Sequence, residues 1–305
     1  MRVHRKFRIV LATALALVLL STGVALAAVV KVLDTPKNEF AGTADDGYFA
    51  YTQSRAGKPY KLNVYLQPPG DRIKVNAAGT IAYYDNIEIG DPTYGDRLVF
   101  MQLSGGNRNI KFWDVAAGGR SNPPDGVNTD KVESKPSISG RYLLFGRGPA
   151  SGGGYMTKVI LFDLETGTGT VIDKAPANGI VFPGTVNGDW LSWTECSPSE
   201  CWAWRHQIST DQTTEVPSSA RLVYTSAIGQ DGTVWYVQSA IGCGANVKLR
   251  RHEIGVGSTT VIDFPDGVDA NVSDLDDSVD PRRLYFDRVR CSNVDNWGIY
   301  RVTAD

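Results

Sequence analysis

Histidine is almost missing from this sequence, which contains three among its 305 residues. One lies in the basic N-terminal segment, so only His206 and His252 remain for acid–base chemistry. Both occupy a place in a repeat, described below, where other copies carry Trp113 or Phe162, and we interpret them as packing residues. The G-x-S-x-G and S-x-x-K motifs of serine nucleophiles are also missing. We therefore predict no catalytic residue.

Cysteine is scarce as well, with four residues and no C-x-x-C spacing, so a Cys₄ metal site is disfavoured. Cys196 and Cys201 flank the short segment SPSE, whereas Cys243 and Cys291 lie 48 residues apart, one length of the repeat. Four cysteines allow three pairings. The spacing favours Cys196–Cys201 within one hairpin and Cys243–Cys291 between neighbouring repeats, as expected in an oxidising compartment. We expect neither a metal nor a cofactor.

Long apolar runs are confined to the start of the chain. A basic segment, residues 2–8, precedes the apolar Ile9–Leu20 and an A-x-A motif at Ala25–Ala27. This order predicts a signal peptide over residues 1–27. A retained membrane anchor is the alternative, but the apolar core is short for a span of about 20 residues. We expect a protein secreted to the bacterial cell exterior, without membrane insertion after signal cleavage.

Basic residues are outnumbered once the signal is removed. The four basic residues of the segment leave 27 Lys and Arg against 33 Asp and Glu, a formal charge of −6. Nonspecific nucleic-acid binding needs a net basic surface, so we expect no nucleic-acid partner.

The helical spacing of apolar residues is missing after residue 28, and short β-branched and aromatic runs alternate with turn residues instead. A turn followed by a strongly apolar strand occurs six times. The strands are YFAY, DRLVF, RYLLF, DWLSW, TVWYV and RRLYF, and their turns are spaced by 48, 45, 48, 44 and 49 residues. A complete copy contains four strand-like segments, which is typical of a propeller blade.

The repeat therefore predicts one all-β domain over residues 28–305, a six-bladed β-propeller with four-stranded antiparallel blades. The sixth copy ends at its third strand, whereas Val29–Asp34 precedes the first copy and is similar to the fourth strands at Val171 and Val261. We expect this N-terminal segment to complete blade six and to close the ring. A closed ring has no open edge strand for aggregation.

The third copy resembles the TolB-like six-bladed propellers. Residues 136–145, PSISGRYLLF, and residues 162–167, FDLETG, match the family's blade signature without the Pro-Asp of its turn. The α/β domain that precedes the propeller in TolB has no counterpart in this sequence. The resemblance implies the fold, but the Tol–Pal role is not carried over, because propellers serve many functions.

An acidic cluster, Asp274, Asp276, Asp277 and Asp280, precedes the last apolar strand. Carboxylates at this spacing could hold Ca²⁺. The glycine and closing glutamate of an EF-type loop are missing, so we interpret the cluster as a solvated turn.

These features favour a secreted, monomeric, non-catalytic binding or scaffolding propeller. Its expected partner is a protein, a peptide or a cell-envelope glycan. The alternative is an extracellular hydrolase, either a glycosidase or a calcium-dependent lactonase, that uses carboxylates at the channel mouth. In a propeller, loops from each outer strand to the next inner strand share one face with the second-to-third-strand hairpins. We predict ligand contacts on this face from Glu39, Asn128, Asp130, Asn178, Arg221 and Asp269.

Overall fold

The computed structural model describes most of the chain after the predicted signal peptide. The described residues are 29–33, 37–45, 47–54, 61–66, 72–75, 88–89, 97–104, 107–115, 117–150, 155–218, 223–239 and 244–304. Within these ranges no helix has the length and apolar character needed to cross a bilayer. Residues 1–27 lie outside the described ranges, so the signal peptide and the domain boundary after it remain predictions.

The strands of the first three blades follow one another along the chain. Blade one comprises β2 (Asn38–Asp45), β3 (Tyr48–Ser54), β4 (Lys61–Leu66) and β5 (Arg72–Val75). Blade two comprises β6 (Glu88–Ile89), β7 (Arg97–Ser104), β8 (Asn107–Asp114) and β9 (Gly119–Ser121). Blade three comprises β10 (Val132–Ser139), β11 (Tyr142–Gly148), β12 (Lys158–Asp163) and β13 (Thr168–Lys174).

The last three blades repeat this order, except that the outer strand of blade six comes from the start of the chain. Blade four comprises β14 (Ile180–Asn187), β15 (Trp190–Cys196), β16 (Cys201–Gln207) and β17 (Gln212–Val216). Blade five comprises β18 (Val223–Ile228), β19 (Val234–Gln238), β20 (Lys248–Glu253) and β21 (Gly257–Asp263). Blade six comprises β22 (Val268–Asp276), β23 (Arg283–Arg290), β24 (Asn293–Thr303) and β1 (Val30–Lys31).

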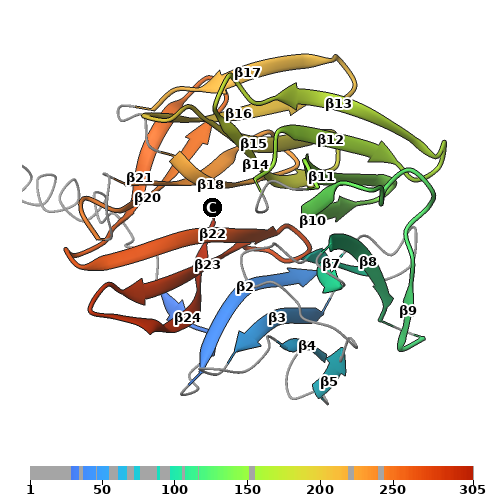
Figure 1. Cartoon of the computed structure of the whole chain (residues 1–305). Helices are drawn as coiled ribbons and strands as arrows, with labels where there is room; N and C mark the ends of the chain where they lie inside the picture. The colour runs from blue at the N-terminus through green and yellow to red at the C-terminus, as the bar shows by residue number, and fades with distance from the viewer. Residues whose placement is uncertain are drawn as a thin grey trace, which may run out of the picture.

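The six sheets form a ring around a central axis (Figure 1). Each sheet is an antiparallel four-stranded meander, and the first strands of successive blades contact one another in order from β2 to β22, which contacts β2 again. In Figure 1 the blue strands of blade one therefore lie beside the red strands of blade six. The predicted all-β propeller of four-stranded antiparallel blades is confirmed.

The ring is closed by the N-terminal strand. β1 pairs with β24 antiparallel, Val30 opposite Arg301 and Lys31 opposite Tyr300. Val32 N donates a further hydrogen bond of 2.9 Å to Ile299 O. The expected closure of blade six by this segment is thus present over residues 30–32, whereas Asp34 lies outside the described ranges.

The hydrophobic core lies between the blades. Leu143 and Phe145 of β11 pack toward blade two, in a cluster with Phe112. Leu144 lies between them in the sequence and packs toward blade four, in a cluster with Leu191. Since both faces of the sheet are covered, each side of the strand needs apolar residues, and alternation is replaced by a continuous apolar run.

Buried hydroxyl groups link the inner strands of neighbouring blades. Ser137 Oγ of blade three accepts a hydrogen bond of 2.8 Å from Val186 N of blade four. At the corresponding place, Thr185 Oγ1 of blade four accepts one of 2.9 Å from Ile228 N of blade five. Both hydroxyls lie beside register shifts in their strands. Such bulges interrupt the ladder, so these side chains supply part of the hydrogen bonding that holds one blade to the next.

Candidate functional site

The boundary between blade six and blade one, called the closing seam below, uses a carboxyl group where the seams between blades three, four and five use a hydroxyl. Asp274 of β22 occupies the repeat position of Ser137 and Thr185. Its Oδ2 accepts hydrogen bonds from Thr43 Oγ1 at 2.7 Å and from Ala44 N at 3.3 Å. Burial raises the pKa of Asp274 to about 7, because the charged form loses its hydration.

A second buried carboxyl group lies in the same seam. Asp287 Oδ2 of β23 accepts a hydrogen bond of 3.0 Å from Ala41 N, and Ala41 has a φ of 51° at the bulge of β2. Burial also raises the pKa of Asp287 to about 7. Asp274 and Asp287 therefore bind the backbone of blade one, and neither lines a described pocket.

A pocket opens at the end of this seam where β23 turns into β24. Its volume is about 390 Å³. We call it the seam pocket, and its walls come from β1, the start of β2 and the β23–β24 hairpin. The lining residues are Lys31, Glu39, Arg288, Val289, Arg290, Ser292, Asn293, Trp297, Gly298 and Tyr300.

Three cations line the seam pocket. Arg288 and Arg290 are two residues apart on β23, so their side chains lie on the same face of the strand. The Arg288 guanidinium lies over the Tyr300 ring, 5.2 Å from its centroid. The Lys31 side chain passes close to Gly298. Its Cε lies 3.4 Å from the position that a Cβ would take on Gly298. With Glu39 as the one acidic residue among those lining the pocket, the formal charge of this set is +2.

The aromatic side chains of the seam pocket are held by their neighbours. Trp297 N donates a hydrogen bond of 3.0 Å to Asn38 Oδ1, and the indole lies tilted against Phe40 at 5.6 Å between ring centroids. Tyr300 stacks on Phe286 at 5.7 Å. Trp297 is nevertheless only half-buried, so part of its indole is accessible to a ligand.

Among the predicted ligand residues that the structure describes, Glu39 alone lines the seam pocket. Its side chain is 1% exposed and accepts a hydrogen bond of 3.2 Å from Gln53 Nε2. Blade three has a glutamate at the same repeat position, Glu133, which is fully buried and accepts a hydrogen bond of 3.0 Å from Arg147 Nε. A glutamate here joins the inner strand to the second strand, so we assign Glu39 a structural part in the pocket wall.

Asn128 and Asn178 have local structural roles. Asn128 binds the backbone of Ile110 twice, through Oδ1 to N at 2.8 Å and through Nδ2 to O at 2.9 Å, and so attaches the loop before β10 to β8. Asn178 is exposed in the turn between β13 and β14 with a φ of 61°. Asparagine tolerates this left-handed conformation better than most residues.

Two further predicted ligand residues, Asp130 and Asp269, do not line the seam pocket. The Asp130 side chain is 83% exposed, with Lys131 Nζ at 3.7 Å. Asp269 of β22 pairs with Val289 of β23, which lines the pocket. Burial raises the pKa of the Asp269 carboxyl group. Arg221 lies outside the described residues. The predicted ligand contacts of these residues remain a prediction.

The charged and aromatic groups of the seam pocket were not among the residues predicted to contact a ligand. The signal that could have found them is the Arg-x-Arg pair, Arg288 and Arg290, directly before the second-to-third-strand hairpin of blade six. This hairpin lies on the face where we expected ligand contacts, but our prediction concentrated on the loops between blades. Lys31 was found as part of the closing strand and not as a pocket residue.

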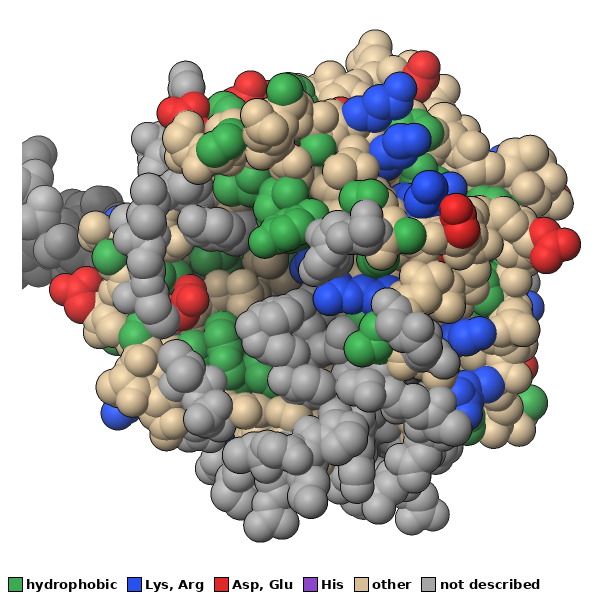
Figure 2. All heavy atoms as spheres, viewed as in Figure 1, with side chains coloured by type: hydrophobic (Ala, Val, Ile, Leu, Met, Phe, Trp, Pro, Cys, Tyr) green, Lys and Arg blue, Asp and Glu red, His purple; other side chains and the backbone are tan. Residues whose placement is uncertain are grey.

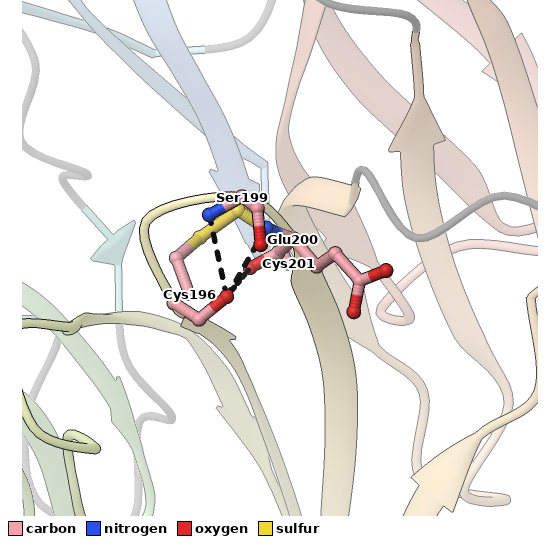
Figure 3. Close-up of a disulfide and its surroundings, with 5 residues drawn as sticks. Cys196, Ser199, Glu200 and Cys201 are labelled. Atoms are coloured by element: carbon pink, nitrogen blue, oxygen red, sulfur yellow. Dashed lines mark hydrogen bonds between the residues drawn. A yellow bond between two sulfur atoms is a disulfide. The ribbon is translucent and has the colours of Figure 1, made fainter.

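The disulfide in blade four is present as predicted. Cys196 and Cys201 are bonded across the β15–β16 hairpin, with their Cα atoms 4.0 Å apart (Figure 3). Ser197 Oγ accepts a hydrogen bond of 3.2 Å from Glu200 N inside this loop. Cys291 is also bonded in a disulfide, and its predicted partner Cys243 lies outside the described residues. The Cys243–Cys291 pairing remains a prediction.

Both histidines are buried in the third strands of their blades. His206 Nδ1 lies 3.0 Å from Thr213 Oγ1, and His252 Nδ1 lies 3.3 Å from Arg205 Nη1. Burial lowers the pKa of each imidazole. Neither histidine lines the seam pocket.

The acidic cluster of blade six is not the solvated turn that we expected. Asp274 and Asp276 are 4% and 2% exposed. Asp277 accepts a hydrogen bond of 2.9 Å from Asn187 Nδ2 of blade four. Asp274 accepts its hydrogen bonds from blade one, whereas Asp276 accepts them from Ser278 in the same loop, and Asp280 is exposed. Among the described residues, no group of three or more His, Cys, Asp or Glu side chains is arranged to hold a metal ion.

Comparison with known proteins supports the fold. No family model and no curated protein sequence matches the chain. TolB from Acinetobacter baumannii is similar in structure, with a TM-score of 0.51 and 13% identity over 85% of this chain, which spans 64% of that TolB. A protein provisionally assigned as a gluconolactonase gives a TM-score of 0.57 at 10% identity, over 92% of both chains.

A third similar structure, an oligogalacturonate lyase in complex with manganese, gives a TM-score of 0.52 and 11% identity. The match covers 91% of this chain and 96% of that one. At such low identity these likenesses show a shared β-propeller fold, and the similar proteins include both TolB and enzymes.

Proposed function

We propose that this chain is a non-catalytic binding propeller that acts outside the cytoplasm and contacts a cell-envelope component through the seam pocket. The observation that carries the proposal is the pocket itself, with two arginines on one strand face and a partly accessible indole. Arginine and tryptophan are the side chains most enriched where binding energy concentrates.

The compartment belongs to the same proposal. The Cys196–Cys201 disulfide suits an oxidising environment, as does the predicted signal peptide of residues 1–27. The net negative charge of the sequence disfavours nucleic acid as the partner. The remaining partner classes are a protein, a peptide or an envelope glycan, bound by a monomer without a cofactor.

The test uses the purified protein and isolated cell-envelope fractions. We expect the wild type to co-sediment with an envelope fraction, and the double variant Arg290→Glu/Trp297→Ala to lose this binding. Arg141→Gln is the matched control. The Arg141 guanidinium also lies over a tyrosine ring, 5.1 Å from the centroid of Tyr142. It lies in the turn between β10 and β11 of blade three, at the other end of a blade from a hairpin such as β23–β24. Equal sedimentation of all three proteins would contradict a role for the seam pocket.

One observation favours the hydrolase alternative. Burial raises the pKa of Glu195, and the neighbouring carboxylate of Asp173 adds to this effect. Trp193 Nε1 donates a hydrogen bond of 2.7 Å to Asp173. A carboxyl group whose pKa is raised in this way can serve as a general acid. Glycoside hydrolysis that is lost in Glu195→Gln would establish this alternative.

A further inference from the structure

We propose that the seam pocket binds a carboxylated sugar residue of an acidic glycan, an inference that rests on the binding role proposed above. The argument depends on the charge of the pocket, on the kind of side chains in its wall and on its size. Each of these features narrows the class of ligand.

The charge favours an anion. Arg288 stacks on Tyr300, and no ion pair joins Arg288 or Arg290 to any carboxylate in the described part of the chain. Elsewhere arginines are neutralised, as where Arg282 lies 3.1 Å from Asp231. A guanidinium fork binds a carboxylate through two parallel hydrogen bonds, so two guanidinium groups on one strand face suit an anionic ligand.

The wall favours a sugar over an acidic peptide. Arginine clusters also bind acidic peptides, so the rest of the lining has to separate the two classes of ligand. Here the apolar lining is limited to Val289 and the aromatic residues, whereas Ser292 and Asn293 offer hydrogen bonds to hydroxyl groups. Trp297 adds a flat apolar surface on which a pyranose ring can stack. A ring with several hydroxyl groups and one carboxylate matches all of these groups.

The size agrees with this class. A volume of about 390 Å³ lies at the lower end of small-ligand pockets, which span roughly 300–1,000 Å³. The pocket therefore suits one end of an oligosaccharide or a single unit of a chain, and not a folded protein domain. Positive charge alone does not single out this site, because Lys and Arg side chains also gather on the right of the view in Figure 2.

The experiment measures binding of trimers of glucuronate, galacturonate and mannuronate by calorimetry, each against the neutral trimer of the same linkage. We expect at least one hexuronate trimer to bind about tenfold more tightly than its neutral counterpart, or better. Arg290→Gln should weaken this binding about tenfold, Arg290→Lys should weaken it less, and Trp297→Leu should weaken it for every bound trimer. Arg141→Gln should leave it unchanged.

Three results would overturn the inference. They are no binding of any hexuronate, equal binding of the neutral trimers, and unchanged binding in Arg290→Gln. A hexaglutamate peptide serves as the competing anion, and its binding in place of the sugars would also overturn the inference. That outcome would leave the proposed binding function intact, provided that envelope sedimentation still depends on Trp297. If no hexuronate binds and envelope sedimentation does not depend on Trp297, the proposed function is contradicted as well.

Discussion

The seams between blades three, four and five differ from the closing seam in the group that joins the inner strands. Ser137 and Thr185 bind the next blade through hydroxyl groups, whereas Asp274 does so through a carboxyl group at the same repeat position. A hydroxyl group stays neutral at every physiological pH. The carboxyl group can ionise, and burial makes its ionisation costly. The stability of the closing seam should therefore depend on pH, whereas that of the seams joined by a hydroxyl group should not.

The closing seam also differs in its covalent continuity. Blades three to five are continuous in sequence, whereas blade six combines β22–β24 with a strand from the other end of the chain. Two carboxyl groups, Asp274 and Asp287, and the short strand β1 hold this junction. We infer that ring opening begins here and that the seam pocket, formed by the same elements, is lost when the ring opens.

Removing the closing strand should have the largest effect. Deleting residues 29–33 removes the pairing with β24 and the packing of Val32 and Leu33 against a cluster that includes Phe49. We expect Tm to fall by about 10 °C or more, with aggregation through the exposed edge. Val30→Thr is the control, since Val30 is 44% exposed and should shift Tm by no more than about 2 °C. An unchanged Tm after the deletion would show that β1 does not hold the ring.

The pH dependence of stability should come next in size. Asp274 and Asp287 have folded pKa values of about 7, above the unfolded value of about 3.9. The folded protein thus holds protons that the unfolded chain has released. The free energy of unfolding should fall as pH rises from about 4 to 7, by on the order of a few kcal/mol, and then stay constant.

A reciprocal exchange tests the origin of this slope. Asp274→Ser converts the closing seam to the hydroxyl type and should make the slope shallower, with Asp287 responsible for part of what remains. Thr185→Asp should add a slope of the same sign at the seam between blades four and five. Denaturant unfolding between pH 4 and pH 8 measures both. An unaltered slope in Asp274→Ser would assign the pH dependence to other groups.

The disulfide of blade four should contribute less to stability than the two buried carboxyl groups. It should not affect the slope of the free energy of unfolding against pH. Its two cysteines are separated by five positions, so the loop it closes in the unfolded chain is short. Replacing Cys196 and Cys201 by serine should lower the free energy of unfolding by about 2 kcal/mol. The loss should be equal at pH 5 and pH 8, because the hairpin lies away from the closing seam. A loss that changes with pH would couple the hairpin to that seam.

A single seam hydroxyl should have the smallest effect. Thr185→Val keeps the shape of the side chain but leaves Ile228 N without its acceptor. We expect a loss of about 1 kcal/mol that does not vary with pH. Ser137→Ala should behave alike, through Val186 N. A much larger loss for either variant would mean that hydroxyl seams are as critical as the closing one.

The fold could be predicted because its signal is repeated. Turn and apolar strand recur at near-constant spacing, and LLF at Leu143–Phe145 needs two covered faces to be stable. The site could not be predicted in the same way. Glu39 was found through its place near a loop, but Arg288 and Trp297 lie within the β23–β24 region, where a repeat pattern indicates packing and not binding.

The sequence by itself determined the number of strands in a blade, the closure of the ring and the Cys196–Cys201 hairpin, because each depends on residues at fixed separations along the chain. Only the tertiary structure decided that Asp274 and Asp287 are buried and that Lys31 meets Arg288 and Arg290 in one pocket. The physical reason is that burial and charge proximity depend on distances between segments far apart in sequence, and closing the ring sets those distances.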